Sequence, residues 1–114
     1  MHMNSTVIVF SKNGMGTAPE ELSSTLVKNY LGLLKEEKHL PMALLFYGEG
    51  ARLVCEGSPV VESLSEMEKK GVKLIVCKTC INFFNLADQV KAGQVGTMAD
   101  ILTLQLEARK VISV

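Results

Sequence analysis

The chain has 114 residues, which is the length of one ordinary domain. Hydrophobic residues make up 47% and charged residues 21% of it, a balance typical of folded globular proteins and not of disordered ones. Twelve basic and twelve acidic residues cancel, so no net positive field attracts nucleic acid or an anionic membrane surface. We therefore expect a single domain over residues 1–114, with neither nucleic acid nor membrane as a partner.

The beginning of the chain and its cysteine count indicate the compartment. Residues 1–5 carry neither the basic start nor the apolar stretch of a secretory signal, and no apolar run reaches the roughly 20 residues that cross a bilayer. We expect residues 1–5 to be flexible and interpret Met1 and His2 as a cloning remnant. Three cysteines form an odd set, which disfavours the disulfide framework of a secreted protein. These features predict a cytoplasmic protein.

Apolar runs of strand length alternate with amphipathic segments of helix length along the chain. This alternation is typical of βαβ units and a parallel sheet. The expected strands are residues 6–10, 42–47, 72–77 and 111–114, with room for one more short strand before the last helix. The pattern predicts an α/β fold, namely a compact three-layer sandwich with a mostly parallel sheet of about five strands.

The first helix is expected to begin at a capping box. Thr17 is a good N-cap, Glu20 can reach back to it, and Pro19 fits the first turn, where its missing N–H is not needed. Apolar residues then return every three to four positions, which predicts one buried stripe. The stripe consists of Leu22, Leu26, Tyr30, Leu33 and Leu34.

The later helices carry their own start and stop signals. The Ser58-Pro59 pair is expected to cap the second helix, and Gly71 suits the left-handed position at its end. A shorter helix is expected over residues 83–91. Thr97 and Asp100 resemble a further capping pair. The inward face of this last helix is predicted to hold Met98, Ile101, Leu102 and Gln105.

The segment that points most directly to chemistry is Cys77-Lys78-Thr79-Cys80. It stands at the carboxyl end of the third expected strand, the edge of an open α/β sheet where ligands and reactive groups gather. Amides at the start of a following helix, together with the positive charge of Lys78, would favour a thiolate there. A thiolate can attack sulfur and carry a persulfide, and the second thiol can resolve a mixed species as a disulfide.

A metal site and a thioredoxin-type site fit this motif less well. A structural zinc site needs four protein ligands, and neither a second Cys-x-x-Cys pair nor a suitably spaced His pair follows, so we expect no metal. The thioredoxin dithiol follows an early strand and works with a later proline, whereas no proline follows Pro59 here. The alternative to chemistry is structural use of the two cysteines as packed residues. Cys55 stands apart from the motif and is expected to be a packed thiol.

Gly14-Met15-Gly16 follows the first expected strand and invites comparison with nucleotide-binding loops. The dinucleotide fingerprint would need a glycine where the chain has Pro19, and the Gly-Lys-Ser/Thr of a P-loop is absent. We therefore expect no cofactor and interpret the glycines as a tight turn, with a small-anion pocket as the alternative. This loop and the Cys77 turn leave the same edge of the sheet, so both can border one site. The candidate binding residues are Asn13, Gly14, Gly16, Lys78 and Thr79.

Several segments share a pattern with one known family. Residues 71–80 (Gly-Val-Lys-Leu-Ile-Val-Cys-Lys-Thr-Cys) and 81–86 (Ile-Asn-Phe-Phe-Asn-Leu) carry most of it. Residues 45–53 (Leu-Phe-Tyr-Gly-Glu-Gly-Ala-Arg-Leu), 56–58 (Glu-Gly-Ser) and 95–100 (Val-Gly-Thr-Met-Ala-Asp) add to it. With these segments the chain resembles the DsrE/DsrF-like family, and it looks most like the C-terminal domain of YedF-type selenium-metabolism proteins.

The resemblance runs from Val7 to Val114 and implies a compact α/β fold related to flavodoxin-like sheets. It also implies a homo-oligomer, such as a dimer, trimer or hexamer. Relatives in sulfur relay carry sulfur as a persulfide on a cysteine at the end of this strand, a place matched here by Cys77, with Cys80 as the second thiol of the YedF-type motif.

The chain departs from the family pattern in two ways. Lys78 stands where glycine is usual, and the Cys-Pro-x-Pro motif of a TusA-like domain does not occur in these residues. The resemblance therefore implies either a separate sulfur donor or acceptor, such as a TusA-like carrier, or loss of the relay role.

Three hypotheses follow. In the first, the protein is a sulfurtransferase-like carrier of sulfur or selenium, in which Cys77 accepts a sulfane sulfur and Cys80 resolves or protects it. In the second, the same pair cycles between dithiol and disulfide as a redox or sensing module. In the third, the protein is a non-catalytic oligomeric binding domain whose cysteines only pack at the sheet edge.

Overall fold

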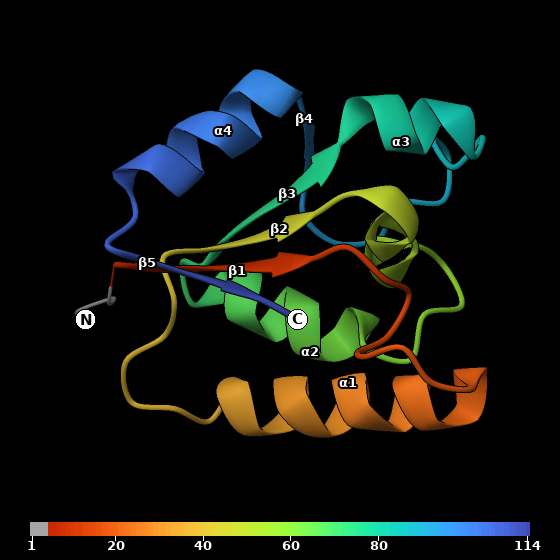
Figure 1. Cartoon of the computed structure of the whole chain (residues 1–114), viewed down its shortest axis with the longest axis horizontal. Helices are drawn as coiled ribbons and strands as arrows, with labels where there is room; N and C mark the ends of the chain where they lie inside the picture. Colours follow the sequence, from red (N-terminus) through yellow and green to blue (C-terminus); the bar gives the residue numbers. More distant parts are fainter. Residues whose placement is uncertain (1–4) are drawn as a thin grey trace.

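Five strands form one sheet in the order β4-β3-β2-β1-β5, and every neighbouring pair is parallel (Figure 1). The computed structural model describes residues 5–114, so the flexibility expected of residues 1–5 lies outside the described residues for all but Ser5, whose carbonyl accepts from the Arg109 and Lys110 N–H groups. The strands are β1 (Thr6–Phe10), β2 (Ala43–Phe46), β3 (Lys73–Cys77), β4 (Gln94–Gly96) and β5 (Lys110–Ser113). The helices are α1 (Glu20–Leu34), the 3-10 helix η1 (Gly48–Val54), α2 (Val61–Lys69), α3 (Lys78–Phe83) and α4 (Met98–Glu107). The predicted α/β fold with five strands is confirmed, and the sheet is parallel throughout.

Both faces of the sheet are buried, which explains why its central strands are continuously apolar. On one face, alternate strand residues such as Ile8 and Leu44 pack with Val27 of α1 and Leu64 of α2. On the opposite face the neighbouring strand residues pack with Ile101 of α4. In Figure 1, α1 and α2 lie below the sheet and α4 lies above it. The helices and the sheet thus form the three layers that the sequence predicts.

α1 begins at Glu20, two residues later than a helix with Thr17 as its N-cap would begin. Its N-cap is Pro19, with φ −55° and ψ 150°, and no side chain caps the first turn. The expected N-cap role of Thr17 is therefore wrong. The physical reason lies in Ala18, because the residue before a proline is driven away from the helical region. A helix that started at Thr17 would have to pass through that residue.

The buried face of α1 also differs from the expected one. Leu22, Leu26 and Leu33 are exposed, at 50%, 39% and 73%, whereas the buried residues of α1 are Ser23, Val27 and Leu31. Ser23 fixes the rotation of α1 about its own axis. Its hydroxyl donates to the Met15 carbonyl at 3.0 Å, and its own carbonyl accepts from the Met15 N–H at 3.1 Å. The expected stripe was correct only for Tyr30 and Leu34, which pack partly buried against the core.

The helix expected over residues 83–91 lies earlier in the chain, at Lys78–Phe83. It ends because Asn85 adopts a left-handed φ of 55°. The N–H groups of Asn85 and Leu86 then bond back to the carbonyls of Asn82 and Ile81, at 3.2 and 2.9 Å. This is the Schellman pattern of a helix end, with asparagine in the place that glycine usually takes. α3 therefore starts directly at the Cys-x-x-Cys motif.

The ends of α2 and α4 follow the expected signals more closely. Gly71 is left-handed, with φ 101°, and closes α2. Thr97 and Asp100 form the expected capping box at the start of α4. The Ser58 hydroxyl accepts from the Val60 N–H at 3.2 Å, but Val60, not Ser58, is the N-cap of α2.

The predicted inward face of α4 is only partly correct. Ile101 is buried at 1% exposure, whereas Met98 and Leu102 are 54% and 52% exposed. One helix meets the sheet along one side only, and Ile101 occupies that side together with the partly buried Leu104. None of the helices described over residues 5–114 is both long and apolar enough to cross a membrane.

The Thr97 cap is expected to stabilise the fold measurably. Thr97→Ala removes the acceptor for the Asp100 N–H and should lower the free energy of unfolding by about 1 kcal/mol. Urea denaturation followed by circular dichroism measures this change. Thr103→Ala, at an exposed position in the same helix, is the matched control and should change stability by a few tenths of a kcal/mol at most. Equal losses in the two variants would contradict the capping role.

Candidate functional site

The two cysteines of the motif lie at the carboxyl edge of β3 but differ in exposure. Cys77 is the last residue of β3, pairs in register with Gly96 of β4, and is 1% exposed. Cys80 lies in the first turn of α3 and is partly exposed. It packs against the apolar clusters on both faces of the sheet. The motif therefore presents one buried and one partly exposed cysteine.

The short connection between strand and helix brings the two sulfurs together. Cys77 is the N-cap of α3, with φ −64° and ψ 122°, so the helix begins without any intervening loop. Residues three apart at the start of a helix lie on the same side, and the Cys77 thiol is close enough to Cys80 to raise the pKa of the Cys80 thiol. All three cysteines of the chain are free thiols.

The backbone N–H that donates a hydrogen bond to the Cys80 sulfur comes from a different loop than expected. The N–H of Gly48, the first residue of η1, donates to the Cys80 Sγ at 3.1 Å. The sequence predicted that amides at the start of the following helix would stabilise the Cys77 thiolate. In the described structure, the Cys77 side chain makes no capping hydrogen bond to α3. The physical reason is that the Cys77 side chain turns into the sheet core instead.

Two glycines allow η1 to sit against the end of β1 and thereby fix the Gly48 N–H. Gly48 has a left-handed φ of 59°. A side chain at Gly50 would collide with the Phe10 carbonyl oxygen. The Tyr47 N–H donates to that same oxygen at 3.2 Å. The loop after β2 is thus anchored on the neighbouring strand.

A second contact ties η1 to α3. Arg52 of η1 donates through Nε to the Glu49 carboxylate at 2.8 Å. Its guanidinium lies over the ring of Phe84, 4.4 Å from the ring centre, in a cation–π arrangement. Phe84 is the C-cap of α3. The Gly48–Cys80 bond and the Arg52–Phe84 contact therefore hold η1 against both ends of α3.

Opposing influences act on the Cys80 thiol. Partial burial is the largest and raises its pKa, because it disfavours the charged form. The Gly48 N–H lowers the pKa, and the neighbouring Cys77 thiol raises it. The net result is a pKa above the ordinary value for a thiol. Lys78, which was expected to favour a thiolate, is not among these influences.

The other candidate binding residues are placed in two groups. Lys78 and Thr79 are exposed at the start of α3, beside the thiols. Asn13 and Gly16 line a hollow over Glu49 and Arg52 that, in the described structure, neither thiol of the motif lines. Gly14 is buried with a φ of 142° against Ser23, so it shapes the turn that receives α1.

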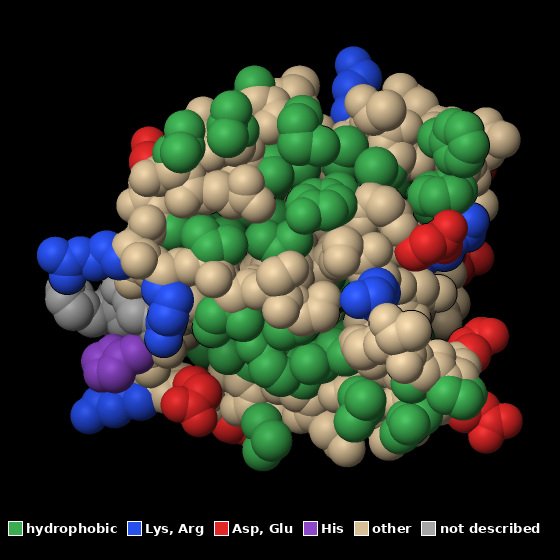
Figure 2. Space-filling view, viewed as in Figure 1, with side chains coloured by type: hydrophobic (Ala, Val, Ile, Leu, Met, Phe, Trp, Pro, Cys, Tyr) green, Lys and Arg blue, Asp and Glu red, His purple; other side chains and the backbone are tan. Residues whose placement is uncertain are grey.

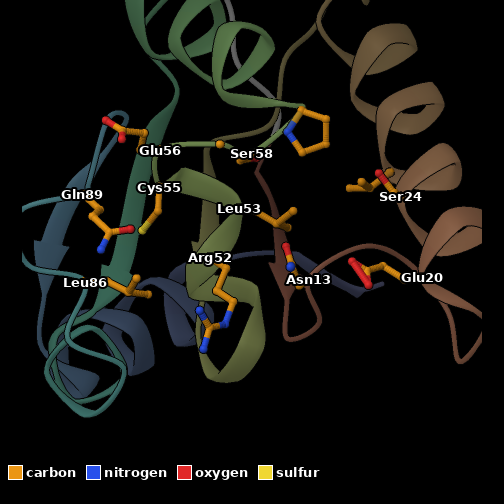
Figure 3. A pocket seen from close by; sticks show the side chains of 13 residues that line it. Asn13, Glu20, Ser24, Arg52, Leu53, Cys55, Glu56, Ser58, Leu86 and Gln89 are labelled. Atoms are coloured by element: carbon orange, nitrogen blue, oxygen red, sulfur yellow. The ribbon is translucent and has the colours of Figure 1, made fainter.

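A cavity of about 300 Å³ lies beside the third cysteine, and its lining extends across η1 from Leu86 and Gln89 to Glu20 and Ser24 of α1 (Figure 3). Cys55 is 2% exposed and donates to the Ala51 carbonyl at 3.4 Å. Burial raises the pKa of its thiol, while the Arg52 charge lowers it less. Asn13 and Arg52 stand at the same cavity in Figure 3. Cys55 is thus the packed thiol that the sequence predicts, and it is separate from the motif.

The described residues bring no metal-binding set together. Over residues 5–114, no group of three or more His, Cys, Asp or Glu side chains is placed to hold a metal ion. The chemistry that these side chains can support is thiol chemistry at Cys77 and Cys80.

Sequence reasoning missed the contribution of η1. Neither the Gly48 N–H nor the Arg52–Phe84 contact was anticipated. One signal was present, since the two glycines of Gly48-Glu49-Gly50 directly follow a strand whose carboxyl end meets that of β3. A glycine-rich turn at that edge can bring a backbone N–H close to a neighbouring loop.

Comparison with known proteins agrees with the observed fold. No curated protein sequence matches the chain. Among solved structures, the chain is similar to the YchN protein from E. coli, with a TM-score of 0.71 and 21% identity, covering 98% of this chain and 100% of that one. It is also similar to MTH1491 from Methanobacterium thermoautotrophicum, with a TM-score of 0.68 and 17% identity over 96% and 97% of the two chains. BT1422 from Bacteroides thetaiotaomicron has a TM-score of 0.64 and 20% identity over 96% and 95%. These likenesses show the fold.

The sequence itself decides the family. The model of the DsrE/DsrF-like family matches residues 5–114, which include the whole described structure and the Cys-x-x-Cys motif. The chain belongs to the DsrE/DsrF-like family.

Proposed function

We propose that the protein is a sulfur carrier that holds a sulfane sulfur as a persulfide on the Cys77–Cys80 pair. One observation carries the proposal, namely two free thiols three residues apart at the carboxyl edge of a parallel sheet, of which Cys80 is partly exposed and accepts a hydrogen bond from a backbone N–H. Membership of a family associated with sulfur relay supports the same chemistry.

The proposed transfer needs no external oxidant. A thiolate of the pair attacks the outer sulfur of a donor persulfide, R–S–SH, so that a new S–S bond forms on the protein and R–S⁻ leaves. An acceptor thiolate then attacks the same outer sulfur and releases the protein thiolate. In each step one S–S bond forms and one breaks, so the sulfane sulfur moves without net oxidation or reduction.

The donor and acceptor belong to the proposal and not to the described geometry. A TusA-like carrier is the proposed protein partner, as the family resemblance implies. Selenium in place of sulfur follows from the resemblance to YedF-type proteins alone. A reducing compartment such as the cytoplasm would keep the three thiols free between transfers.

A dithiol/disulfide redox module is the second candidate function, because the same placement of two free thiols three residues apart at the start of α3 favours it. In this case the pair gives up two electrons and two protons to an oxidant and forms a disulfide, without carrying sulfur. The two functions differ in whether a variant with one thiol of the pair gains a sulfur atom.

A homo-oligomer is part of the proposed function, and α4 is its proposed contact surface. Met98, Leu102 and Leu106 recur every four residues along α4 and are 54%, 52% and 76% exposed. Figure 2 shows hydrophobic side chains gathered over this helix. The chain has no net charge to oppose self-association, so we take the occupant of this surface to be a second copy of the chain.

The carrier proposal predicts sulfur capture at the pair. The reduced protein is pulsed with inorganic polysulfide, quenched by alkylation and examined by intact-protein and peptide mass spectrometry. At least one of the variants Cys77→Ala and Cys80→Ala should gain one sulfur atom that reductant removes, because no second thiol of the pair can displace it. The double variant should gain none, and Cys55→Ala should behave as the wild type. Absence of sulfur from both single variants, with a disulfide in the wild type, would favour the redox module.

Thiol reactivity should rise with pH beyond the ordinary thiol range. Because burial raises the pKa of Cys80, its thiolate is a minor form at neutral pH, and the alkylation rate should increase about tenfold per pH unit there. The rate should still be rising where the same cysteine in urea-unfolded protein has levelled off. A plateau below the unfolded value would mean that the Gly48 N–H outweighs burial.

The oligomer proposal predicts that charge on α4 dissociates the assembly. Leu106→Glu should shift the mass measured by light scattering after gel filtration from an oligomer to a monomer, because an unpaired carboxylate would be buried at the contact. Leu33→Glu is the matched control on α1, where the leucine is 73% exposed, and should leave the mass unchanged. Dissociation by Leu33→Glu alone would assign the contact to α1 instead.

A further inference from the structure

We infer that Cys80, and not Cys77, is the thiol that accepts the sulfur, and that Cys77 is the buried thiol that resolves it. The inference rests on the proposed sulfur carrier and reverses the order expected from the family resemblance. Burial, hydrogen bonding and the position of the two sulfurs on α3 support it.

Access to the donor separates the two thiols. An attacking thiolate must approach the outer sulfur of the donor along the S–S bond that breaks. Cys77 is 1% exposed, and its apolar cluster includes Val9, Leu45 and Ile101. A donor therefore cannot reach Cys77 in the described conformation. Cys80 lies one helical turn further along, partly exposed where the two apolar clusters meet, so a donor can reach its sulfur without unfolding of the sheet.

The hydrogen bond from η1 also distinguishes the thiols. The Gly48 N–H reaches the Cys80 Sγ at 3.1 Å, whereas α3 gives the Cys77 side chain no capping bond. An N–H group binds an anionic sulfur more strongly than a neutral thiol, so this contact favours the attacking form of Cys80. The Gly48 N–H is already in place before the sulfur donor arrives, because Gly50 lets η1 pack against the Phe10 carbonyl.

The position of Cys77 then suits the second step. Once Cys80 carries the extra sulfur, the Cys77 thiolate can attack the Sγ of Cys80 from within the fold. A Cys77–Cys80 disulfide forms, the outer S–S bond breaks, and hydrosulfide leaves with its electron pair. A dithiol reductant supplies the two electrons that restore the free thiols. A persulfide that meets no acceptor is thus discharged as sulfide.

Variants that each lack one cysteine test this order of the two thiols. Wild type, Cys77→Ala, Cys80→Ala and the control Cys55→Ala are each pulsed with inorganic polysulfide, and sulfur on the protein and free sulfide are measured over time. Cys77→Ala should load within about twofold of the wild-type rate and retain its sulfur longer, with release of sulfide lost. Cys80→Ala should load at least about tenfold more slowly, since only a buried thiol is left. Cys55→Ala should match the wild type.

Three other outcomes would overturn the inference or the proposed carrier function on which it rests. Fast loading of Cys80→Ala together with slow loading of Cys77→Ala would reverse the order and leave the carrier function intact. Equal loading of both would remove the distinction between the thiols. No loading of any protein, wild type included, would reject the carrier function itself.

A separate measurement does not depend on sulfur transfer or on the folding of variants. Brief alkylation of the native wild type with iodoacetamide, followed by peptide mapping, should modify Cys80 at least about tenfold faster than Cys77 or Cys55, because only Cys80 is accessible. Faster labelling of Cys77 would contradict the inference even if every variant failed to fold.

Discussion

Parallel pairing of β1, β2 and β3 is the constraint on which the site depends. Parallel strands all end at the same edge of a sheet, so the segments that follow them must meet there whatever their separation in the sequence. This brings η1, which follows β2, onto α3, which follows β3. Burial of both faces holds the strands in register, and a strand that slipped by one residue would turn its apolar side chains to the wrong face. The contact between Gly48 and Cys80 is a consequence of that register.

At this edge, a single sulfur experiences two opposing effects. Packing against the core partly shields Cys80 from water and favours its neutral form, while a fixed backbone N–H favours the anion. Burial is the larger effect, so the thiol at rest is protonated more fully than a free cysteine. A thiol with a raised pKa is a stronger nucleophile once ionised, although a smaller fraction of it is ionised. Such a thiol reacts slowly with electrophiles at neutral pH, because only its thiolate attacks them.

The elements follow from local chemistry, and the sequence predicted them well. Continuous apolar runs identified β1, β2 and β3, and the capping residues Thr97 and Asp100 identified the start of α4. The errors concern segments with two plausible solutions. α1 is apolar on more than one side, and periodicity alone cannot decide between a face that contains Leu26 and one that contains Val27. The decision comes from Ser23, which bonds to the loop after β1.

The sequence by itself determined the α/β architecture and the placement of a Cys-x-x-Cys motif at a strand end, because strand periodicity and motif spacing are properties of neighbouring residues. It also determined the family, because the family model matches residues 5–114. Only the tertiary structure decided which sulfur is buried and which is accessible. That difference depends on α4 covering Cys77 and on η1 reaching Cys80, and both contacts join segments far apart in the chain. Burial and hydrogen bonding are set by such contacts, so the roles of the two thiols could not be read from their spacing.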